Sequence, residues 1–250
     1  MRQTFSTITL LMAGFGFQSV NGQVNNTAFE LTGGISSFIY QGDLTPARFG
    51  SYRTMRPGIM LAGSKLLNSY FSVRGALNFA GLHGDDSKYS SPAWRQERNL
   101  KFSSFISEIS AVAIYNFKGT NGDNDYKTVS PYVFGGAGVS LLRTRRDYSQ
   151  FDVDFFGNES NVVEGLAADI ARRPTRVLLV LPVGAGARYP ITSSLSVALE
   201  ANYRISYSDY IDGFSRVAGP TKNDHYYSIT AAVVYTIGNG RGIKCPVIKP

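Results

Sequence analysis

The chain has 250 residues and a formal net charge of +7, yet only 17% of its residues are charged, and it holds 26 glycines, 15 tyrosines and 16 phenylalanines. This composition argues against a helical bundle and suits many short strands joined by turns. The single cysteine, Cys245, excludes a scaffold stapled by several disulfides.

The N-terminal segment predicts a secretory signal peptide over residues 1–22. Arg2 is its only charged residue, the apolar run ITLLMAGFGF follows, and Val20, Asn21 and Gly22 end it. This run is too short for a membrane anchor, which needs about 20 apolar residues. We therefore expect the mature domain to span residues 23–250 and to be exported, either as a soluble protein or as a barrel in an outer membrane.

Alternation of apolar and polar residues predicts eight strands in the mature chain. The clearest pattern runs over residues 195–207 and exceeds the ~9–11 residues that a tilted transmembrane strand requires. Residues 70–81 and 225–238 alternate similarly, and the apolar faces of all three begin or end with Tyr or Phe, as in membrane-barrel girdles. In chain order the expected strands are 28–39, 56–67, 70–81, 102–117, 130–142, 176–189, 195–207 and 225–238.

The connections between the expected strands alternate in length. Asn68–Ser69 and residues 190–193 are tight turns, whereas long polar segments occupy 40–55, 82–101, 143–175 and 208–224. An even strand number with short turns at one end and long loops at the other is typical of outer-membrane barrels. The sequence thus predicts an all-β, eight-stranded antiparallel transmembrane barrel with short periplasmic turns and long extracellular loops, in the cell outer membrane. The alternative is a soluble lipocalin-like barrel, which would bury its apolar face inward.

Charged residues at inward positions predict a filled lumen. An eight-stranded barrel has an interior that its own side chains just fill. The inward set carries two charges of each sign: Arg74, Glu108, Glu200 and Arg204. We expect these charges to compensate one another, with Glu200 depending on Arg204. No pore and no catalytic site is expected there, because no substrate can enter.

The sequence predicts neither a cofactor nor a metal ion. The glycine clusters at 134–138 and 182–186 lie inside expected strands and do not complete a G-x-G-x-x-G pattern, so they indicate close packing in the barrel wall. Asp123, Asp125 and Tyr126 in NGDNDY resemble half a calcium loop. They lack the glycine and the distal glutamate of an EF-hand, and a polar turn is the simpler interpretation.

The stretch YSDYIDGFS, residues 207–215, allows a catalytic or a structural interpretation. Acids and a histidine gather at the outer ends of the last two strands, where a rim hydrolase would hold them: Asp209, Asp212, Asp224 and His225. A lipid-A deacylase needs His-x-Ser, but two tyrosines separate His225 from Ser228. As a structural corner, Asp209 and Asp212 would bond nearby backbone N–H groups. We expect this corner and no enzyme.

Two basic runs flank the longest loop. RTRR at 143–146 and ARRPTR at 171–176 lie at the predicted outer rim. There they would either meet lipopolysaccharide phosphates electrostatically or remain solvated. Nucleic acid is not an expected partner at this location.

Several fragments resemble the PorG-type family of small outer-membrane barrels from the Bacteroidetes type IX secretion system. They are YQGDL (40–44), ERNLKF (97–102), SPYVFGGAGV (130–139), DYIDGFS (209–215) and the trailing Cys245–Pro246. The resemblance spans residues 28–246, and the family often has an acid where this chain has Gly213. The family-motif residues, which we expect to be structural, are Gly42, Asp43, Leu44, Asn99, Leu100, Phe102, Asp209, Tyr210, Ile211 and Asp212.

The resemblance implies a non-enzymatic role in protein transport. The barrel would anchor or contact the periplasmic ring, namely the lipoprotein PorK and its partner PorN. The alternatives are a general surface barrel, such as an adhesin or envelope stabiliser, and the rim hydrolase. We expect the ring to dock on the turn 118–129 and the tail 238–250, and the outer loop 147–170 to be dispensable. The possible contact residues are Asp123, Asp125, Tyr126, Arg241, Lys244 and Cys245.

Overall fold

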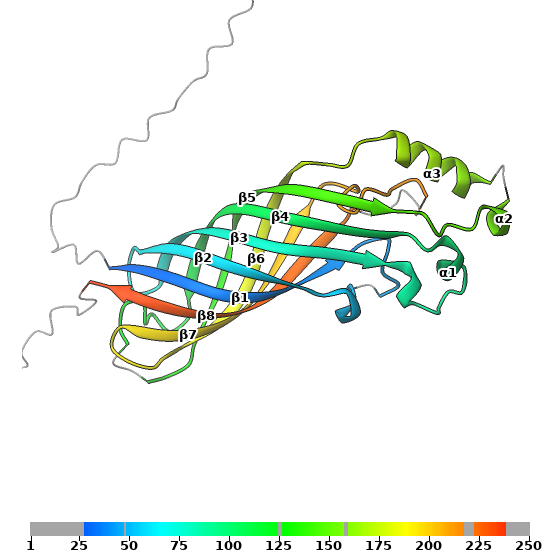
Figure 1. The fold of residues 1–250 in the computed structure, drawn as a ribbon. Helices are drawn as coiled ribbons and strands as arrows, with labels where there is room; N and C mark the ends of the chain where they lie inside the picture. Colours follow the sequence, from blue (N-terminus) through cyan, green and yellow to red (C-terminus); the bar gives the residue numbers. More distant parts are fainter. Residues whose placement is uncertain (1–27, 48, 125–126, 158–159, 218–222, 239–250) are drawn as a thin grey trace, which may run out of the picture.

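The computed structural model describes residues 28–238, apart from 48, 125–126, 158–159 and 218–222. Eight antiparallel strands form one closed barrel in sequential order (Figure 1). They are β1 (Phe29–Gln41), β2 (Arg56–Leu66), β3 (Phe71–Asp85), β4 (Lys101–Asn116), β5 (Ser130–Asp147), β6 (Val177–Pro190), β7 (Leu195–Ser206) and β8 (His225–Ile237). The predicted signal peptide, and the tail beyond Gly238, lie outside the described residues.

Closure follows from the pairing of the first and last strands. β1 pairs with β8 from Phe29 opposite Ile237 to Gln41 opposite His225, so neither strand leaves an open edge. A membrane requires this, because lipid cannot satisfy free backbone groups. None of the described helices is long and apolar enough to cross a membrane.

All eight predicted strands are confirmed, and two are longer than predicted. β3 continues to Asp85 and β5 to Asp147. Along β5 the side chains keep alternating beyond Leu142, but Arg143 and Arg145 now occupy the outward positions. The sequence pattern weakened there because apolar outward residues give way to charged ones. These two strand ends therefore extend beyond the apolar belt.

The longer connections carry the remaining structure and gather at one end. The helices are η1 (Tyr52–Thr54), η2 (Asp86–Lys88), α1 (Trp94–Arg98), α2 (Val153–Phe156) and α3 (Asn161–Ala171). Figure 1 shows the three α-helices at the end opposite to the start of β1 and the end of β8. Longer loops mark the extracellular end of such barrels, so this end is called the outer end below, and the other the periplasmic end.

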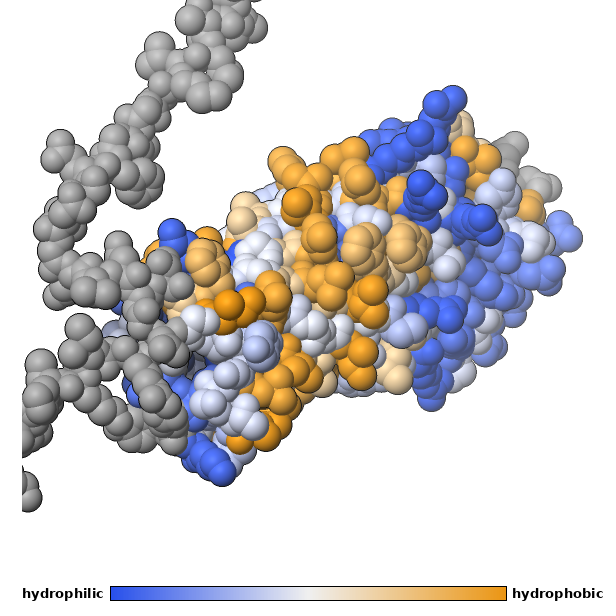
Figure 2. Space-filling view, turned by 60° about the vertical axis from the view of Figure 1, so that its left-hand side comes forward, coloured by the Kyte–Doolittle hydropathy of each residue, from blue (hydrophilic) through white to orange (hydrophobic). Residues whose placement is uncertain are grey.

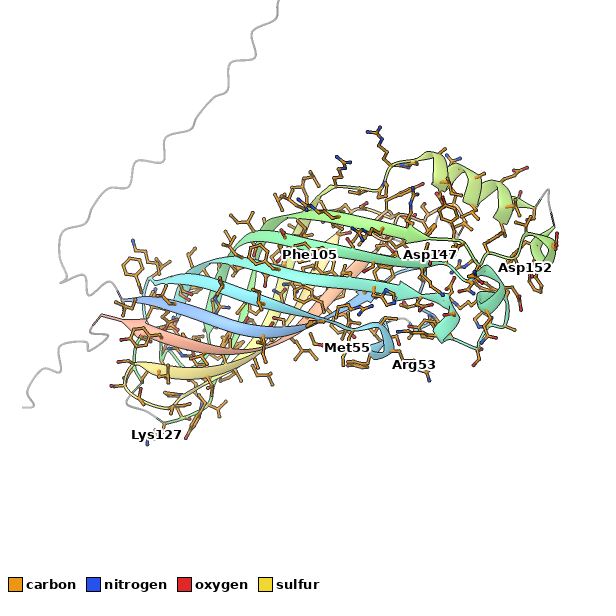
Figure 3. All side chains as sticks on the ribbon, in the orientation of Figure 1. Arg53, Met55, Phe105, Lys127, Asp147 and Asp152 are labelled. Carbon is orange, nitrogen blue, oxygen red and sulfur yellow. The ribbon has the colours of Figure 1, made fainter. Side chains whose placement is uncertain are left out.

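The outside of the barrel is apolar. Large apolar side chains point outward, with Ile35 72% and Leu179 70% exposed. Figure 2 shows a hydrophobic band across the middle of the visible face and hydrophilic residues toward the outer end. In Figure 3, Phe105 lies within this middle region, Asp147 and Asp152 lie toward the outer end, and Lys127 lies at the periplasmic end. The lipocalin-like alternative does not fit, because a soluble barrel buries its apolar face.

Aromatic side chains gather near the periplasmic turns, as a membrane girdle requires. The Tyr115 ring lies 5.1 Å from Phe71, 5.2 Å from Phe117 and 6.3 Å from Tyr70. Amphipathic aromatic rings suit the boundary between lipid and water. This ring cluster sets the periplasmic border of the apolar belt.

The interior is divided into two unequal parts. The larger hydrophobic cluster fills the outer half and contains residues from strands and from loops, among them Phe38, Leu82, Phe102, Ile211 and Phe214. A small cluster of Val112, Ile114, Tyr132 and Phe134 lies in the periplasmic half, where the other buried residues are mostly polar. A Cβ on Gly186 would lie 2.6 Å from the Tyr132 ring, so the predicted packing role of this glycine cluster is confirmed.

Candidate functional site

The segment 207–217 folds into the outer mouth of the barrel and is called the plug loop here. Ile211 and Phe214 are fully buried and pack with Leu44, Leu100 and Phe102. The stretch YSDYIDGFS forms a structural corner, as the sequence predicts, but it lies inside the mouth of the barrel and not at the rim. Its two apolar residues draw it inside, where they complete the outer hydrophobic cluster.

Tyr40 bridges two buried aspartates beneath the plug loop. Its hydroxyl oxygen lies 2.7 Å from Asp212 Oδ2 and 2.6 Å from Asp224 Oδ1. The backbone N–H of Phe214 donates to Asp212 at 2.8 Å, which confirms the predicted turn bond, and that of Ile211 donates to Asp224 at 3.0 Å. One hydroxyl has a single proton, so two such short contacts require a second proton on one of the carboxyl groups.

The environment of the two aspartates favours that additional proton. Burial raises the pKa of Asp212, and the neighbouring charge of Asp224 raises it further. Burial also raises the pKa of Asp224. Gly42 allows the cluster to close, since a Cβ there would lie 1.9 Å from Asp224 Oδ1 and 2.1 Å from the Tyr40 hydroxyl. Position 42 therefore requires a glycine, because any side chain there would collide with Asp224 and Tyr40.

A second polar cluster holds the loops above the barrel. Arg95 Nη1 donates to Asp86 at 2.8 Å, and Arg98 donates to the same carboxylate at 2.6 and 3.0 Å. Both guanidinium groups also donate to the backbone carbonyl of Asp43. The helix α1 presents the two arginines three residues apart, on one face. Asn99 caps the C-terminus of this helix with a left-handed φ of 43°, a conformation that asparagine tolerates.

The helix α3 is tied to the plug loop through one buried carboxylate. Asp169 accepts hydrogen bonds from the Tyr210 hydroxyl at 2.7 Å and from the backbone N–H groups of Ser215 and Val217 at 3.1 and 3.0 Å. Leu166 of the same helix joins the outer hydrophobic cluster. The prediction that loop 147–170 is dispensable remains untested, but its α3 part supports the plug loop.

The structure brings the family-motif residues together. The first group follows β1 and consists of Gly42, Asp43 and Leu44. The second precedes or begins β4 and consists of Asn99, Leu100 and Phe102. The third belongs to the plug loop and consists of Tyr210, Ile211 and Asp212. Asp209 lies beside them and accepts a hydrogen bond from the Ser215 hydroxyl at 2.6 Å, so the predicted bond to a backbone N–H group is wrong for Asp209. Sequence reasoning missed the residues that bind them, namely Tyr40, Asp86, Arg95, Arg98 and Asp169. No local pattern marks these residues, because their partners are distant in sequence.

The four candidates for a rim hydrolase do not form a catalytic arrangement. Asp209, Asp212 and Asp224 bind Ser215, Tyr40 and backbone groups, and His225 Nδ1 accepts the backbone N–H of Ser206 at 3.2 Å. Among the described residues, none of these carboxylates bonds to the histidine. No group of His, Cys, Asp or Glu in the described part of the chain has the arrangement of a metal site.

The charges in the lumen compensate one another, but the predicted pairing is wrong. Glu200 pairs with Arg74 at 2.6 Å and accepts the Tyr132 hydroxyl at 2.6 Å. Arg204 instead pairs with Glu108 at 3.0 Å. The reason is strand geometry, since residues four apart on one strand lie about 13 Å apart along it. Each side chain therefore reaches across to an opposing strand.

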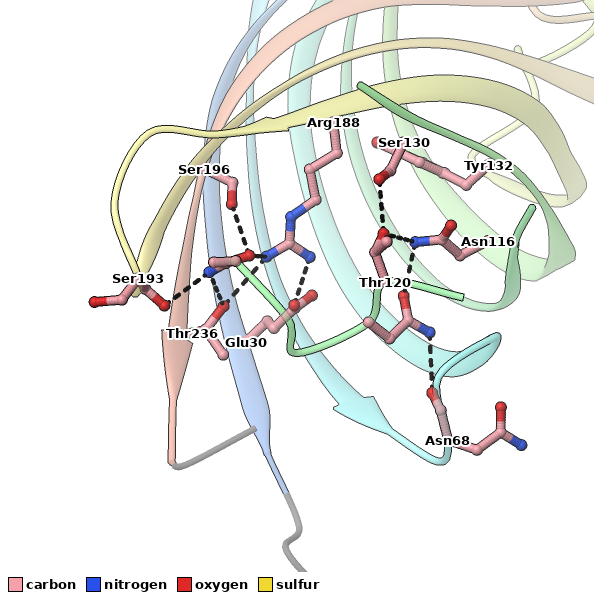
Figure 4. A network of polar contacts seen from close by, with 12 residues as sticks. Glu30, Asn68, Asn116, Thr120, Ser130, Tyr132, Arg188, Ser193, Ser196 and Thr236 are labelled. Carbon is pink, nitrogen blue, oxygen red and sulfur yellow. Dashed lines mark hydrogen bonds and ion pairs between the residues drawn. The ribbon is translucent and has the colours of Figure 1, made fainter. Parts of the chain in front are cut away.

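The turn at residues 117–129 crosses the periplasmic mouth (Figure 4). Asn121 donates to the backbone oxygen of Asn68 at 3.2 Å, and Asn124 donates to that of Ser193 at 3.0 Å. The turn is thus bonded to both of the short periplasmic turns. Asp123 belongs to this turn, whereas Asp125, Tyr126, Arg241, Lys244 and Cys245 lie outside the described residues.

Above this turn, Arg188 pairs with Glu30 at 2.5 Å and donates to Thr236 at 3.2 Å. A cavity of about 20 Å³ remains between Glu30, Arg74, Arg188 and their neighbours. This volume is enough for about one water molecule. The prediction of a filled lumen fits this geometry.

The two basic runs divide into structural and exposed residues. Arg146 donates to the backbone oxygens of Asp169 and Gly213, and the Arg172 guanidinium lies 3.9 Å from the centre of the Tyr210 ring. Arg172 is itself exposed, and the four other exposed members, Arg143, Arg145, Arg173 and Arg176, have no ion pair among the described residues. Four cations thus face the surroundings at the outer rim.

Comparison with known proteins matches residues 7–236 to the family described as "Outer membrane protein beta-barrel domain". No curated protein matches the sequence. Three solved structures are similar to this chain. The first is Ail, the attachment invasion locus protein of Yersinia pestis, in complex with the heparin analogue sucrose octasulfate; it is 11% identical, the match covers 85% of this chain and 99% of that chain, and the TM-score is 0.45. The second is Neisserial surface protein A, with 18% identity, coverage of 83% of this chain and 97% of that chain, and a TM-score of 0.45. The third is OprG of Pseudomonas aeruginosa, with 9% identity, coverage of 85% of this chain and 96% of that chain, and a TM-score of 0.47.

Proposed function

The chain belongs to the outer membrane protein β-barrel domain family, and we propose that it serves as the outer-membrane barrel of a type IX secretion system. In this role it anchors the periplasmic ring by contacting the lipoprotein PorK and its partner PorN. The resemblance of three segments to the PorG-type family supports the proposal. Those segments meet in the buried cluster at the outer mouth, so they describe one structural unit of the barrel.

The observation that carries the proposal is the closed interior. Ion pairs fill the strand-lined lumen, the plug loop fills the outer mouth, and the turn 117–129 crosses the periplasmic mouth. A barrel without a path for solutes acts through its two ends or through its lipid-facing wall. This favours a role as an anchor over a role as a channel.

The periplasmic end offers a surface to such a partner. The turn 117–129 is longer than the turns that follow β2 and β6, and it exposes Lys118 and Lys127. A lipoprotein is held at the membrane by its acyl chains, so it would meet the barrel at the level of these turns. The proposed contact surface is therefore residues 118–129 together with the chain from residue 238 onward.

Co-purification of ring proteins tests this contact. Lys118→Glu combined with Lys127→Glu, or truncation after Gly238, should reduce the capture of ring proteins about tenfold or more. The barrel itself should still insert, because both lysines are exposed. Insertion is checked by heat-modifiable migration on a gel, where the unheated barrel runs faster.

Charge reversal at the outer rim is the matched control. Arg173→Glu combined with Arg176→Glu changes two exposed cations at the other end and should leave ring capture unchanged. If the periplasmic variants still capture the ring and the outer variant does not, the assignment of the ring contact to the periplasmic end is wrong. If neither pair affects capture or secretion, the general surface barrel becomes the better interpretation.

The exposed arginines at the outer rim favour an additional contact with lipopolysaccharide. Arg143 and Arg145 point outward from β5, directly beyond the outward Leu141. Guanidinium groups bind phosphate oxygens, and this height corresponds to the boundary of the apolar belt. Replacing both arginines by glutamine should weaken the thermal stabilisation that added lipopolysaccharide provides, and high salt should mask the difference.

A further inference from the structure

Two hollows on the outer wall of the barrel meet at Gln41 and Tyr203. The upper hollow, of about 820 Å³, lies between the loop after β1, the start of α1 and the start of β8. The lower hollow, of about 360 Å³, continues down the wall over β6, β7 and β8. Neither belongs to the plug loop or to the lumen. Gln41 and Tyr203, joined by a hydrogen bond of 2.9 Å, line both hollows, so the two hollows adjoin along the wall and are together called the groove.

The upper hollow combines aromatic faces with neutral polar groups. Trp94 is 38% exposed, and the Tyr203 and His225 rings lie 5.6 Å apart. Thr45 and Asn223 supply a hydroxyl and an amide. Ligand sites are commonly lined by aromatic side chains with a few placed polar groups, and this combination suits the ring and hydroxyl groups of a sugar.

The charge of the upper hollow argues against an anionic headgroup. Arg95 lines it and shares the Asp86 carboxylate with Arg98, at 2.8 and 2.6 Å. Asp43 lines the same hollow and supplies a second carboxylate, so the charges of the two arginines and the two aspartates balance. The Nε of Arg95 has no hydrogen-bond partner among the described residues. The hollow thus offers hydrogen bonding without a net positive charge, in contrast to the exposed arginines on β5.

The lower hollow is apolar. Its lining includes Phe49, which is 71% exposed, together with Val183, Ala201 and Tyr227. Val183 and Ala201 point outward from adjacent strands, and Ala201 lies opposite Ala185 and Ile229. Outward positions of these strands face hydrocarbon in a membrane barrel. A hydrocarbon chain therefore fits this part of the groove.

We propose that the groove binds a neutral glycolipid of the outer leaflet. The sugar headgroup lies on Trp94 and the Tyr203–His225 pair, and one acyl chain follows Val183 and Ala201. A free sugar would leave the lower hollow unused, and a lipid without a sugar would leave the upper hollow unused. The shared lining at Gln41 and Tyr203 is what favours one amphipathic ligand over two separate ones.

Trp94 is the only tryptophan in the chain, so its fluorescence reports on the upper hollow. The full-length barrel is placed in phosphatidylcholine nanodiscs that contain increasing fractions of digalactosyl diacylglycerol. We expect a saturable change in Trp94 emission. Phosphatidylglycerol, which has chains and a negative charge but no sugar, and free lactose should each leave the emission unchanged. An equal response to phosphatidylglycerol or to lactose, or no response to the galactolipid, overturns the proposal.

Matched substitutions test the lower hollow. Ala201→Phe fills it and should weaken galactolipid binding about tenfold. Ala113→Phe makes the same change at another outward alanine, on β4, and should leave binding unchanged. Phe49→Ser, in an exposed loop, provides a second variant that does not alter a strand and should also weaken binding. Equal binding by wild type, Ala201→Phe and Phe49→Ser overturns the placement of the chain.

Discussion

Within the strand-lined lumen each buried glutamate faces an arginine, whereas at the outer mouth two buried aspartates share a tyrosine. Glu30, Glu108 and Glu200 meet arginines from opposing strands at 2.5–3.0 Å. Asp212 and Asp224 have no ion pair among the described residues and instead contact Tyr40 and backbone N–H groups. The same barrel therefore holds buried acids by opposite charge inside the lumen and by a retained proton at the outer mouth.

The two kinds of acid differ because their partners come from different parts of the chain. Inside the lumen the partners project from facing strands, and an arginine is long enough to cross it. At the outer mouth the plug loop brings its own backbone, and Ile211 and Phe214 exclude water. Ionised acids are costly in such surroundings, so a proton stabilises them there. We expect the outer mouth to respond to pH and the ion pairs of the lumen to respond to loss of charge.

The largest expected effect is at the ion pair of Arg204 and Glu108 inside the lumen. Arg204→Leu leaves Glu108 buried without its cation and should lower the free energy of unfolding by about 4 kcal/mol. Urea unfolding in micelles measures this. The double variant Arg204→Leu with Glu108→Leu should lose markedly less, because no unpaired charge remains. A double variant as unstable as the single one would contradict the pairing.

The next effect concerns the outer mouth. Phe214→Ala removes a fully buried ring from the outer hydrophobic cluster and should cost about 3 kcal/mol. Because the ring belongs to a loop, the loss should release the plug loop before the barrel unfolds. Protease cleavage at Arg216, on intact barrels, should therefore become faster. Unchanged cleavage, with a lowered urea midpoint for the whole barrel, would show that loop and barrel unfold together.

A pH titration sharpens the comparison. The raised pKa values of Asp212 and Asp224 mean that the folded state binds a proton more tightly than the unfolded chain. From the ordinary aspartate value of about 4 up to the raised value, the free energy of unfolding should fall as pH rises, by at most about 1.4 kcal/mol per pH unit for one proton. Asp224→Asn should flatten this slope, whereas Asp154→Asn, at an exposed acid, should keep it. Equal slopes in wild type and Asp224→Asn would contradict the shared proton.

Two tyrosine substitutions give the smallest expected effect and separate the two ends. Tyr40→Phe removes the hydroxyl between the aspartates, and Tyr132→Phe removes the hydroxyl that donates to Glu200. Each should cost about 1 kcal/mol. Only Tyr40→Phe should change the pH dependence of unfolding, because Arg74 still pairs with Glu200. A pH dependence altered by Tyr132→Phe instead would reverse the assignment.

The strands could be predicted from the sequence, and the plug could not. Alternation over residues such as Leu195–Ser206 depends only on near neighbours, and it placed all eight strands. The burial of Ile211 and Phe214 depends on Leu44, Leu100 and Phe102, which lie far away in the chain. Likewise, the inward position of Arg204 follows from alternation, but its pairing with Glu108 depends on tilt and barrel closure. Local patterns thus predict the strands of the barrel wall, whereas the plug loop and the ion pairs of the lumen depend on how the closed barrel brings distant residues together.

Single-channel recording in a planar bilayer tests most directly the central claim that the barrel is closed and acts through its surfaces. The purified barrel should insert and produce no steady conductance, because ion pairs cross the lumen and the cavity near Glu30 and Arg188 measures about 20 Å³. Phe214→Ala should also remain silent, since the ion pairs and the turn 117–129 still close the periplasmic half. A steady conductance of the wild-type barrel would contradict the closed interior and, with it, the case for an anchor.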